Sequence, residues 1–387
     1  AHGGDVTYPI ASRKAQVWLC RLAAGLARPR PIGRPLLYLV ATGPMLGPCA
    51  ALGRAQFEDC TALSLTTTAP RTLARKKFED PDWTASGEPR ATVSLDGLQT
   101  LWINTGTLCN ITCRNCYIES SPSNDRLIYL TAAEVQPFLQ EADALGTREI
   151  GFTGGEPFLN PDILDMLADG LAGGFEVLVL TNAMLPMQRP RLKLGLERLN
   201  ETYKGKLTLR VSLDHYTRAL HETERGPRTW EITLQGMDWL SARGFQIAIA
   251  GRTCWGEDEV DARAGYAALI KEHGWHIEPN DAAQLMLFPE MDGADDVPEI
   301  TTRCWDILNK SPSEVMCSST RMIVKRKGAA APVVLPCTLL PYDRAFEMGT
   351  TLAAAAEANG GMFANGAVKL CHSHCAKFCV LGGGSCS

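Results

Sequence analysis

Apolar runs of strand length alternate with longer amphipathic stretches from about residue 100 to about residue 290. The apolar runs contain few polar positions, which is typical of parallel strands covered by helices. In the longer stretches, the apolar residues recur at the spacing of one helix face. The pattern predicts six strands, at 101–106, 148–155, 175–182, 206–214, 245–253 and 282–290, and five intervening helices, at 131–145, 161–173, 189–203, 229–244 and 259–274.

This order of strands and helices predicts an α/β fold. Strand–helix–strand units joined in this way are right-handed and build a parallel sheet. Six repeats favour an open, partial (β/α)6 TIM-like barrel over a closed barrel of eight strands. In such folds the chemistry lies at the carboxyl ends of the strands, so residues that directly follow a strand are the first candidates for a functional site.

The sequence on either side of this core has a different pattern. Residues 1–95 are rich in Ala, Arg, Pro and Thr and show little periodicity, so we expect an irregular, loosely ordered N-terminal extension. Residues 96–300 make up the predicted barrel. Within 301–387, the stretch 322–336 predicts a β-hairpin, because two apolar runs flank a turn that contains Gly. We therefore expect a small, cysteine-rich C-terminal extension of β-hairpin and helical segments.

Composition and charge narrow the classes of function. The chain has 387 residues and a formal net charge of −5, so neither nucleic acid nor an anionic lipid surface is expected as the main partner. The apolar segment 36–53 is interrupted by Pro and Gly, and we do not expect it to span a membrane. The N-terminus shows no secretory signal pattern. Fourteen cysteines, many of them clustered, predict metal ligation in a reducing cytoplasm rather than a disulfide scaffold.

Three cysteines follow the first predicted strand at close spacing: Cys109, Cys113 and Cys116. Such spacing can bring three thiolates to one metal centre. A structural zinc site needs four protein ligands, usually in two separated pairs, and the fourth is absent locally. Three thiolates at the mouth of a barrel suit a [4Fe–4S] cluster with one open iron, at which a small molecule can bind.

The Cys-x3-Cys-x2-Cys motif after the first strand of a partial barrel resembles the radical S-adenosylmethionine (SAM) superfamily. Further motifs lie at the ends of the second, fourth and fifth predicted strands. The resemblance implies that the Gly-Gly-Glu motif with Glu156 meets the amino group of SAM. Ser212 and Asp214 would contact its ribose or carboxylate, and Arg252 would pair with its carboxylate. A Ser and an Asp at a strand end are also common turn formers and helix caps, and Arg252 equally suits a surface ion pair. The SAM-binding residues expected from the resemblance are Gly154, Gly155, Glu156, Ser212, Asp214 and Arg252.

The resemblance also implies a reaction. In the family, SAM chelates the open iron, an electron from the reduced cluster cleaves its C–S bond, and the resulting 5′-deoxyadenosyl radical abstracts hydrogen from a substrate. The cofactor carries the difficult chemistry, while the protein orients it and excludes water. We therefore expect an enzyme of the oxidoreductase or transferase type and an external one-electron donor of the flavodoxin or ferredoxin type. The substrate, a peptide side chain or a small metabolite, and the residues that meet it are not evident from the sequence.

The C-terminal cysteines resemble the auxiliary-cluster extension called twitch or SPASM. In that extension two cysteines and an intervening Gly frame a β-hairpin, and Cys317, Gly328 and Cys337 fit these positions. The final cysteines depart in spacing from the full two-cluster pattern, so the resemblance implies one auxiliary [4Fe–4S] cluster. A structural zinc site is the competing interpretation, because cysteine spacing does not separate zinc from iron–sulfur. The expected ligands are Cys317, Cys337, Cys375 and Cys379, with Cys371 and Cys386 as alternatives and a His ligand from His372 or His374 left open.

Two further residues lie close to the predicted site. Cys254 follows the fifth strand and suits a hydrogen donor or a substrate contact, although a buried, inert cysteine has the same pattern. Tyr117 suits either shielding of the cluster or packing. The alternative class of function is a non-catalytic iron–sulfur electron carrier or redox sensor. Such a protein has no need of the Gly-Gly-Glu motif and the strand-end polar residues that suit SAM.

Overall fold

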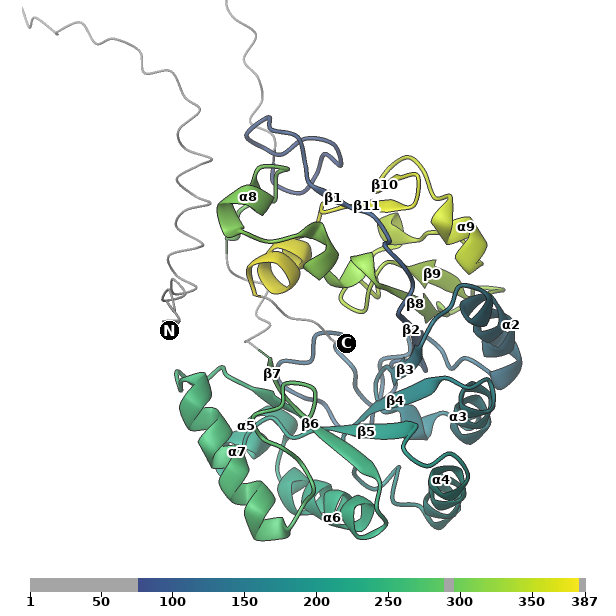
Figure 1. Cartoon of the computed structure of the whole chain (residues 1–387), viewed down its shortest axis with the longest axis vertical. Helices are drawn as coiled ribbons and strands as arrows, with labels where there is room; N and C mark the ends of the chain where they lie inside the picture. Colours follow the sequence, from purple (N-terminus) through teal and green to yellow (C-terminus); the bar gives the residue numbers. More distant parts are fainter. Residues whose placement is uncertain (1–75, 289–295, 383–387) are drawn as a thin grey trace, which may run out of the picture.

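The computed structural model describes residues 76–288 and 296–382. Figure 1 shows a barrel-like arrangement of strands and helices in its lower half and a smaller region of short helices and strands above it. The expectations for most of the N-terminal extension, for the apolar segment 36–53 and for Cys386 lie outside the described residues.

The six predicted strands are confirmed as neighbouring parallel strands of one sheet. Their order in the sheet, β7-β6-β5-β4-β3-β2, follows the order along the chain, so each strand pairs with the next one through a helical connection. This arrangement is the partial barrel that the sequence predicts. The bounds are β2 Thr100–Asn104, β3 Glu149–Thr153, β4 Glu176–Thr181, β5 Leu207–Ser212, β6 Gln246–Arg252 and β7 Leu285–Phe288.

The five predicted helices are also confirmed, and they cover the outside of the curved sheet (Figure 1). The first begins after Thr131, which exchanges hydrogen bonds with Glu134 in a capping box. A further helix, α5 (Arg218–Arg225), was not predicted, because its segment is strongly charged and has few apolar residues. The confirmed helices are α2 Ala132–Ala144, α3 Ile163–Ala172, α4 Pro190–Thr202, α6 Thr229–Ala242 and α7 Glu259–His273.

The hairpin predicted in the C-terminal part is confirmed, and it belongs to the barrel sheet. Strands β8 (Thr320–Val324) and β9 (Val333–Leu335) pair antiparallel, and Gly328 between them has φ of 79°. Strand β8 also pairs in parallel with β2, so the hairpin lies at the edge of an eight-stranded sheet among the described residues. The sequence did not predict this placement. It gives the first barrel strand a second hydrogen-bonding partner instead of an exposed edge.

A small second sheet joins the segment before the barrel to the C-terminal part. Strand β1 (Thr92–Val93) pairs with β11 (Ala367–Lys369), which pairs in turn with β10 (Phe363–Ala364), and both pairings are antiparallel. One hydrophobic core contains residues from β1, the barrel and the tail. The division at residues 95 and 300 stays a prediction. The short helices are η1 Pro157–Leu159, α8 Cys304–Leu308, η2 Pro312–Glu314, η3 Met316–Ser318, η4 Arg344–Phe346, α9 Leu352–Ala356 and η5 Cys375–Leu381.

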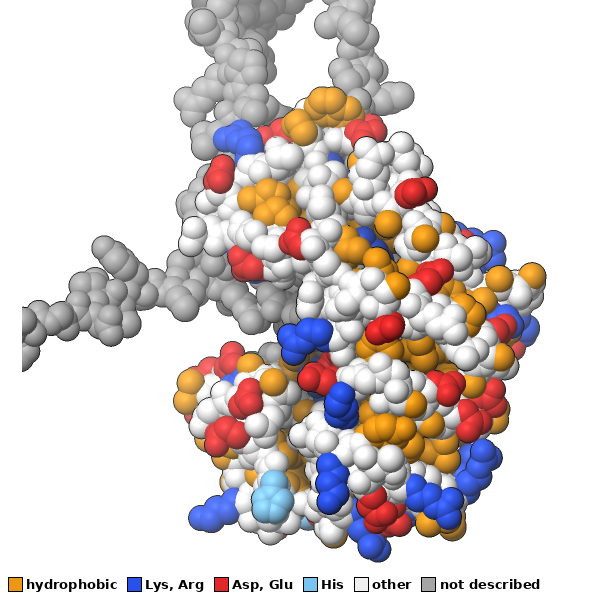
Figure 2. All heavy atoms as spheres, turned by 45° about the vertical axis from the view of Figure 1, so that its right-hand side comes forward, with side chains coloured by type: hydrophobic (Ala, Val, Ile, Leu, Met, Phe, Trp, Pro, Cys, Tyr) orange, Lys and Arg blue, Asp and Glu red, His pale blue; other side chains and the backbone are white. Residues whose placement is uncertain are grey.

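The charges on one face of the molecule and the length of its helices bear on the expected partners. On the face in Figure 2, basic and acidic side chains are interspersed, so this face has no broad basic area of the kind that binds a phosphate backbone. Within residues 76–288 and 296–382, none of the helices combines the length and the apolar character that a membrane span requires.

Candidate active site at the mouth of the barrel

A cavity lies at the carboxyl ends of the barrel strands. It holds about 180 Å³, which exceeds the ~150 Å³ of an engineered cavity known to take up benzene. Its wall is formed by the loop after β2, by the ends of β3 to β7, by α5 and by residues next to the tail cysteines. Both the barrel and the C-terminal part therefore contribute to one site.

The three loop cysteines share this wall. Cys109, Cys113 and Cys116 all line the cavity, and Cys109 is buried while the other two are half-buried. Burial, and then the nearby carboxylate of Glu156, raises the pKa of the Cys109 thiol to about 12. Burial also raises the pKa of Cys113, although Arg225 opposes this shift. Thiols with raised pKa values become thiolates when a metal binds them.

The two glycines after β3 allow the end of this strand to pack against the cysteine loop. A Cβ atom on Gly155 would lie 2.1 Å from the carbonyl oxygen of Leu108, and one on Gly154 would lie 2.4 Å from that of Gly106. The amides of Gly155 and Glu156 donate to the same two carbonyls, at 2.8 and 3.1 Å. Both glycines also line the cavity. The Gly-Gly pair thus fixes the loop on the sheet and leaves backbone open to a ligand.

The carboxylate of Glu156 is held by the protein itself. Its oxygens accept hydrogen bonds from Thr181 Oγ1 and the Asn182 amide, both at 2.9 Å, and from the Phe158 amide at 3.2 Å. The residue is 1% exposed, and burial raises its pKa to about 7 against these three hydrogen bonds. Thr181 and Asn182 line the cavity, whereas Glu156 lies behind them. Its contact with SAM therefore stays a prediction.

A buried cluster of charges follows β5 and β6. Arg225 Nε lies 2.8 Å from Asp214 Oδ2, and Arg252 Nε lies 3.3 Å from Asp214 Oδ1. Burial acts to raise the pKa of Asp214, but the two guanidinium groups outweigh it and the pKa lies below its usual value. All three residues and Ser212 line the cavity. Two positive charges thus face one negative charge within this cluster.

Helix α5 and strand β6 hold the cysteine loop from two sides. The amide of Arg114 donates to the carbonyl of Glu224 at 2.7 Å, and Asn115 Nδ2 donates to the Glu224 carboxylate at 3.3 Å. On the other side, Arg252 Nη2 donates to the carbonyl of Asn115 at 3.0 Å. Arg225, which lines the cavity, and Glu224, which contacts the cysteine loop, are candidate site residues that the sequence analysis missed. The sequence feature that could have indicated them is the polar segment between the end of β5 and the predicted helix that became α6.

The tail cysteines gather behind the opposite wall. Cys317, Cys337, Cys371 and Cys375 are buried, and burial followed by the thiols of Cys337, Cys317 and Cys371 raises the pKa of Cys375 well above its usual value. The group therefore includes Cys371, which the sequence analysis ranked as a less favoured ligand than Cys379. Cys379 is buried in the same core, one turn of η5 after Cys375. The choice among these ligands stays a prediction.

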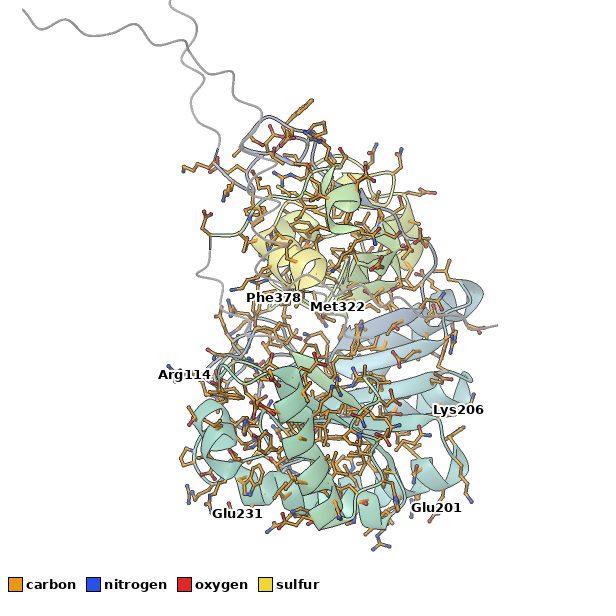
Figure 3. All side chains as sticks on the ribbon, turned by 60° about the vertical axis from the view of Figure 1, so that its left-hand side comes forward. Arg114, Glu201, Lys206, Glu231, Met322 and Phe378 are labelled. Carbon is orange, nitrogen blue, oxygen red and sulfur yellow. The ribbon has the colours of Figure 1, made fainter. Side chains whose placement is uncertain are left out.

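The cavity is lined by residues next to these cysteines, and the cysteines themselves lie behind them. Met316 precedes Cys317, Thr338 follows Cys337, and Phe378 precedes Cys379; all three neighbours line the cavity. Figure 3 labels Phe378 at the lower side of the C-terminal helix, which faces the barrel. The cavity wall on this side therefore consists of these neighbours and not of the tail cysteines themselves.

Other candidates have different surroundings. Tyr117 lines the cavity, which is compatible with shielding a cluster, whereas Cys254 is half-buried and is not part of the wall. His374 Nδ1 lies 3.1 Å from the carbonyl oxygen of Leu339. Over residues 76–288 and 296–382, no three side chains of His, Cys, Asp or Glu are arranged in ready metal-binding geometry, in the loop or in the tail.

Comparisons with known proteins point to one family. The family model of the radical SAM superfamily matches residues 103–261. The subtilosin biosynthesis protein AlbA of Bacillus subtilis is 33% identical over 147 residues, which are 37% of this chain and 30% of AlbA. The AdoMet-dependent heme synthase of Methanosarcina barkeri is 30% identical over 142 residues, 36% of this chain and 38% of that protein. The match thus spans well under half the length of either relative.

The fold comparison agrees with the sequence matches. The crystal structure of Streptococcus suis SuiB bound to S-adenosylmethionine aligns with a TM-score of 0.50 at 13% identity, over 68% of this chain and 66% of SuiB. At this identity the likeness concerns the fold alone. Together with the cysteine loop after β2 and the Gly-Gly-Glu motif after β3, these matches support the assignment of the barrel region, residues 103–261, to the radical SAM superfamily.

Proposed function

We propose that this chain is a radical SAM enzyme that holds a [4Fe–4S] cluster on Cys109, Cys113 and Cys116 and cleaves SAM in the cavity beside them. The observation that carries the proposal is the shared cavity: the three thiols line the same space as Asp214 and Arg252. An electron carrier has no use for a charged space that can admit a second molecule. The cavity therefore favours an enzyme over the alternative of a carrier or redox sensor.

The types of residue around the cavity suit a cluster and SAM, and this chemistry supports the proposal. Arg252 Nη1 is buried beside the cavity and has no hydrogen-bond partner among the described residues, so it can receive a carboxylate. When bound, the cluster and SAM supply the electron transfer and the 5′-deoxyadenosyl radical. Asp214 keeps the guanidinium groups of Arg225 and Arg252 in place. Phe288, Leu339 and other apolar side chains of the wall exclude water from the reacting groups.

We propose a peptide as the substrate class, with hydrogen abstraction from one of its side chains. The support is the likeness to AlbA, a bacteriocin biosynthesis protein. The likeness to the heme synthase favours a small metabolite as the second candidate. An external one-electron donor of the flavodoxin or ferredoxin type would reduce the cluster in either case.

We also propose one auxiliary [4Fe–4S] cluster on Cys317, Cys337, Cys375 and either Cys371 or Cys379. The support is the burial of these thiols and their mutual influence on Cys375. Because side chains of neighbouring residues separate them from the cavity, the position favours an exchange of electrons with a substrate radical over direct binding of substrate. A structural zinc ion is the competing occupant, since zinc accepts the same thiolates.

The test is anaerobic reconstitution with iron and sulfide, followed by dithionite and SAM. We expect 5′-deoxyadenosine, detected by mass spectrometry, only when reductant and SAM are both present. Cys116→Ala should abolish it, whereas the matched variant Cys254→Ala, a half-buried cysteine outside the cavity wall, should retain it. A protein that carries the full iron content and binds SAM but forms no 5′-deoxyadenosine would contradict the proposal.

A further inference from the structure

Arg321 is a buried charge in the middle of strand β8. Only 2% of the residue is exposed to solvent. Nη1 donates to the carbonyl oxygens of Cys317 and Thr320, both at 2.7 Å, and Nη2 donates to that of Gly366 at 3.4 Å. These carbonyls satisfy much of the hydrogen bonding of the guanidinium group. They carry no net charge, so the positive charge itself is left without a counter-charge.

No carboxylate of residues 76–288 and 296–382 forms an ion pair with Arg321. Other buried arginines differ in this respect: Arg90 lies 2.6 Å from Glu299, and Arg225 lies 2.8 Å from Asp214. A buried charge that lacks an opposite charge is strongly unfavourable. We therefore expect a negative charge close to Arg321 once the protein has bound its metal cofactors.

The thiols of Cys317 and Cys337 are the groups that can supply this charge. Burial lowers the pKa of Arg321, and the thiolate forms of these two cysteines oppose the shift, so both lie within electrostatic reach. The hydrogen bond from Arg321 Nη1 to the carbonyl of Cys317, at 2.7 Å, places the guanidinium group next to this cysteine. Binding to iron or zinc holds such thiols as thiolates. A cluster with three or four thiolates would place net negative charge beside the guanidinium group.

We propose that Arg321 is the counter-charge of the auxiliary iron–sulfur cluster and raises its reduction potential. The inference rests on the proposed auxiliary cluster. Reduction adds one electron and one negative charge to a cluster, and a fixed positive charge nearby stabilises the reduced form more than the oxidised form. Because the site is buried and shielded from water, the effect is weakly screened. Arg321 does not line the cavity, so the proposed role concerns the cluster and not the binding of SAM.

The experiment measures the auxiliary cluster alone. The full chain with Cys109, Cys113 and Cys116 replaced by Ala is reconstituted, and its remaining cluster is titrated with dithionite under electron paramagnetic resonance. Adding Arg321→Gln should lower the ratio of reduced to oxidised cluster at a fixed potential about tenfold, which is about 59 mV for a one-electron couple. Arg321→Lys should restore most of the ratio. Arg326→Gln, which removes a buried arginine paired with Glu347, is the matched control and should change little.

Each outcome separates the two proposals. If the triple variant holds no iron, both the auxiliary cluster and the role of Arg321 are overturned. If it holds iron and Arg321→Gln leaves the potential unchanged, only the role of Arg321 is overturned. If Arg321→Gln loses its iron, urea unfolding of the metal-free chain decides: Arg321→Met should then unfold at a higher urea concentration than its parent, because the uncompensated charge is gone. A lower urea midpoint would overturn the role of Arg321.

Discussion

The loop cysteines and the tail cysteines differ in how they meet the cavity. Cys109, Cys113 and Cys116 form part of its wall, and two of them are half-buried. The tail cysteines are at most 7% exposed and are covered by Met316, Thr338 and Phe378. A cluster on the loop can thus present one iron to a ligand, whereas a cluster on the tail can exchange electrons but is shielded from substrate. Similar residues in different settings suit different tasks.

The two regions also differ in what holds them. The loop is fixed by polar contacts with α5 and β6, including the charges of Asp214, Arg225 and Arg252. The tail cysteines lie in the hydrophobic core, with Arg321 as the charge beside them. The loop should therefore respond to changes in its charged network, and the tail to loss of its metal.

The largest effect is expected at the loop. Replacing Cys109, Cys113 and Cys116 together by Ala should remove about four irons per chain, the content of one [4Fe–4S] cluster. It should also abolish 5′-deoxyadenosine formation, because no open iron is left to bind SAM. Iron and sulfide analysis with mass spectrometry of the product measures both. A triple variant with unchanged iron content would contradict the assignment of the loop.

Replacing Cys317, Cys337, Cys375 and Cys379 by Ala should have a partial effect. About half of the iron should be lost, and cleavage of SAM in the absence of substrate should largely survive, since the loop cluster is intact. Formation of a modified peptide or metabolite should stop. Elemental analysis of the anaerobically purified parent provides the control: zinc at this site in place of iron would favour a structural role for the tail.

The parts of the fold that could be predicted are the strands and helices that follow from short sequence patterns. The apolar runs and their spacing place β2 to β7 and the main helices, because parallel strands under helices must be apolar throughout. The pairing of β8 with β2 was not predicted. Thr320 lies opposite Thr100, and the sequence of neither strand indicates which other strand it pairs with. Helix α5 was missed for a different reason. Its eight residues contain only two apolar side chains, those of Ala219 and Leu220, which are too few to show an apolar helix face.

The same distinction separates the site residues that could be predicted from those that could not. The cysteine loop and the Gly-Gly-Glu motif could be predicted because their residues lie close together in the sequence. Arg225 and Arg321 could not, because the role of a charged residue depends on which groups the fold brings to it. The close approach of Gly155 to the backbone of Leu108 in the cysteine loop was not predicted, because the two residues lie on separate segments of the sequence. Contact of the Gly-Gly-Glu motif with SAM stays a prediction.

A smaller effect is expected from the charged network around the loop. Asp214→Asn leaves the buried guanidinium groups of Arg225 and Arg252 without their counter-charge, and removal of one partner from a buried ion pair typically costs about 3–5 kcal/mol. Urea unfolding of the metal-free chain measures this loss. Asp125→Asn is the matched control, because Asp125 pairs with Lys327 on the surface, where exposed ion pairs add little. Equal urea midpoints for the two variants would contradict the view that the buried charges around Asp214 hold the loop region more firmly than a surface ion pair does.

The smallest effect concerns acid and His221, a residue of α5 close to Asp214 and Arg225. His221 is fully buried, and neither ring nitrogen has a hydrogen-bond partner among the described residues. Burial, followed by the charge of Arg225, lowers its pKa to about 3, whereas the unfolded value is about 6.5. Between these values the unfolded chain binds more protons, so this contribution to stability is complete above about pH 6.5 and is lost progressively as the pH falls towards 3.

His221→Phe should remove that dependence, because Phe has a similar shape and no proton to bind. We expect the variant and the parent to unfold at similar temperatures at pH 7. At pH 5 the variant should unfold at the higher temperature, since the parent alone must keep a buried imidazole neutral. Thermal unfolding of the metal-free chains at both pH values measures the difference and avoids the acid sensitivity of the clusters. His276→Phe, at a histidine for which no such burial holds, controls for the loss of any one imidazole. Parallel acid responses of the parent and His221→Phe would show that α5 contributes no acid-sensitive hold on the cysteine loop.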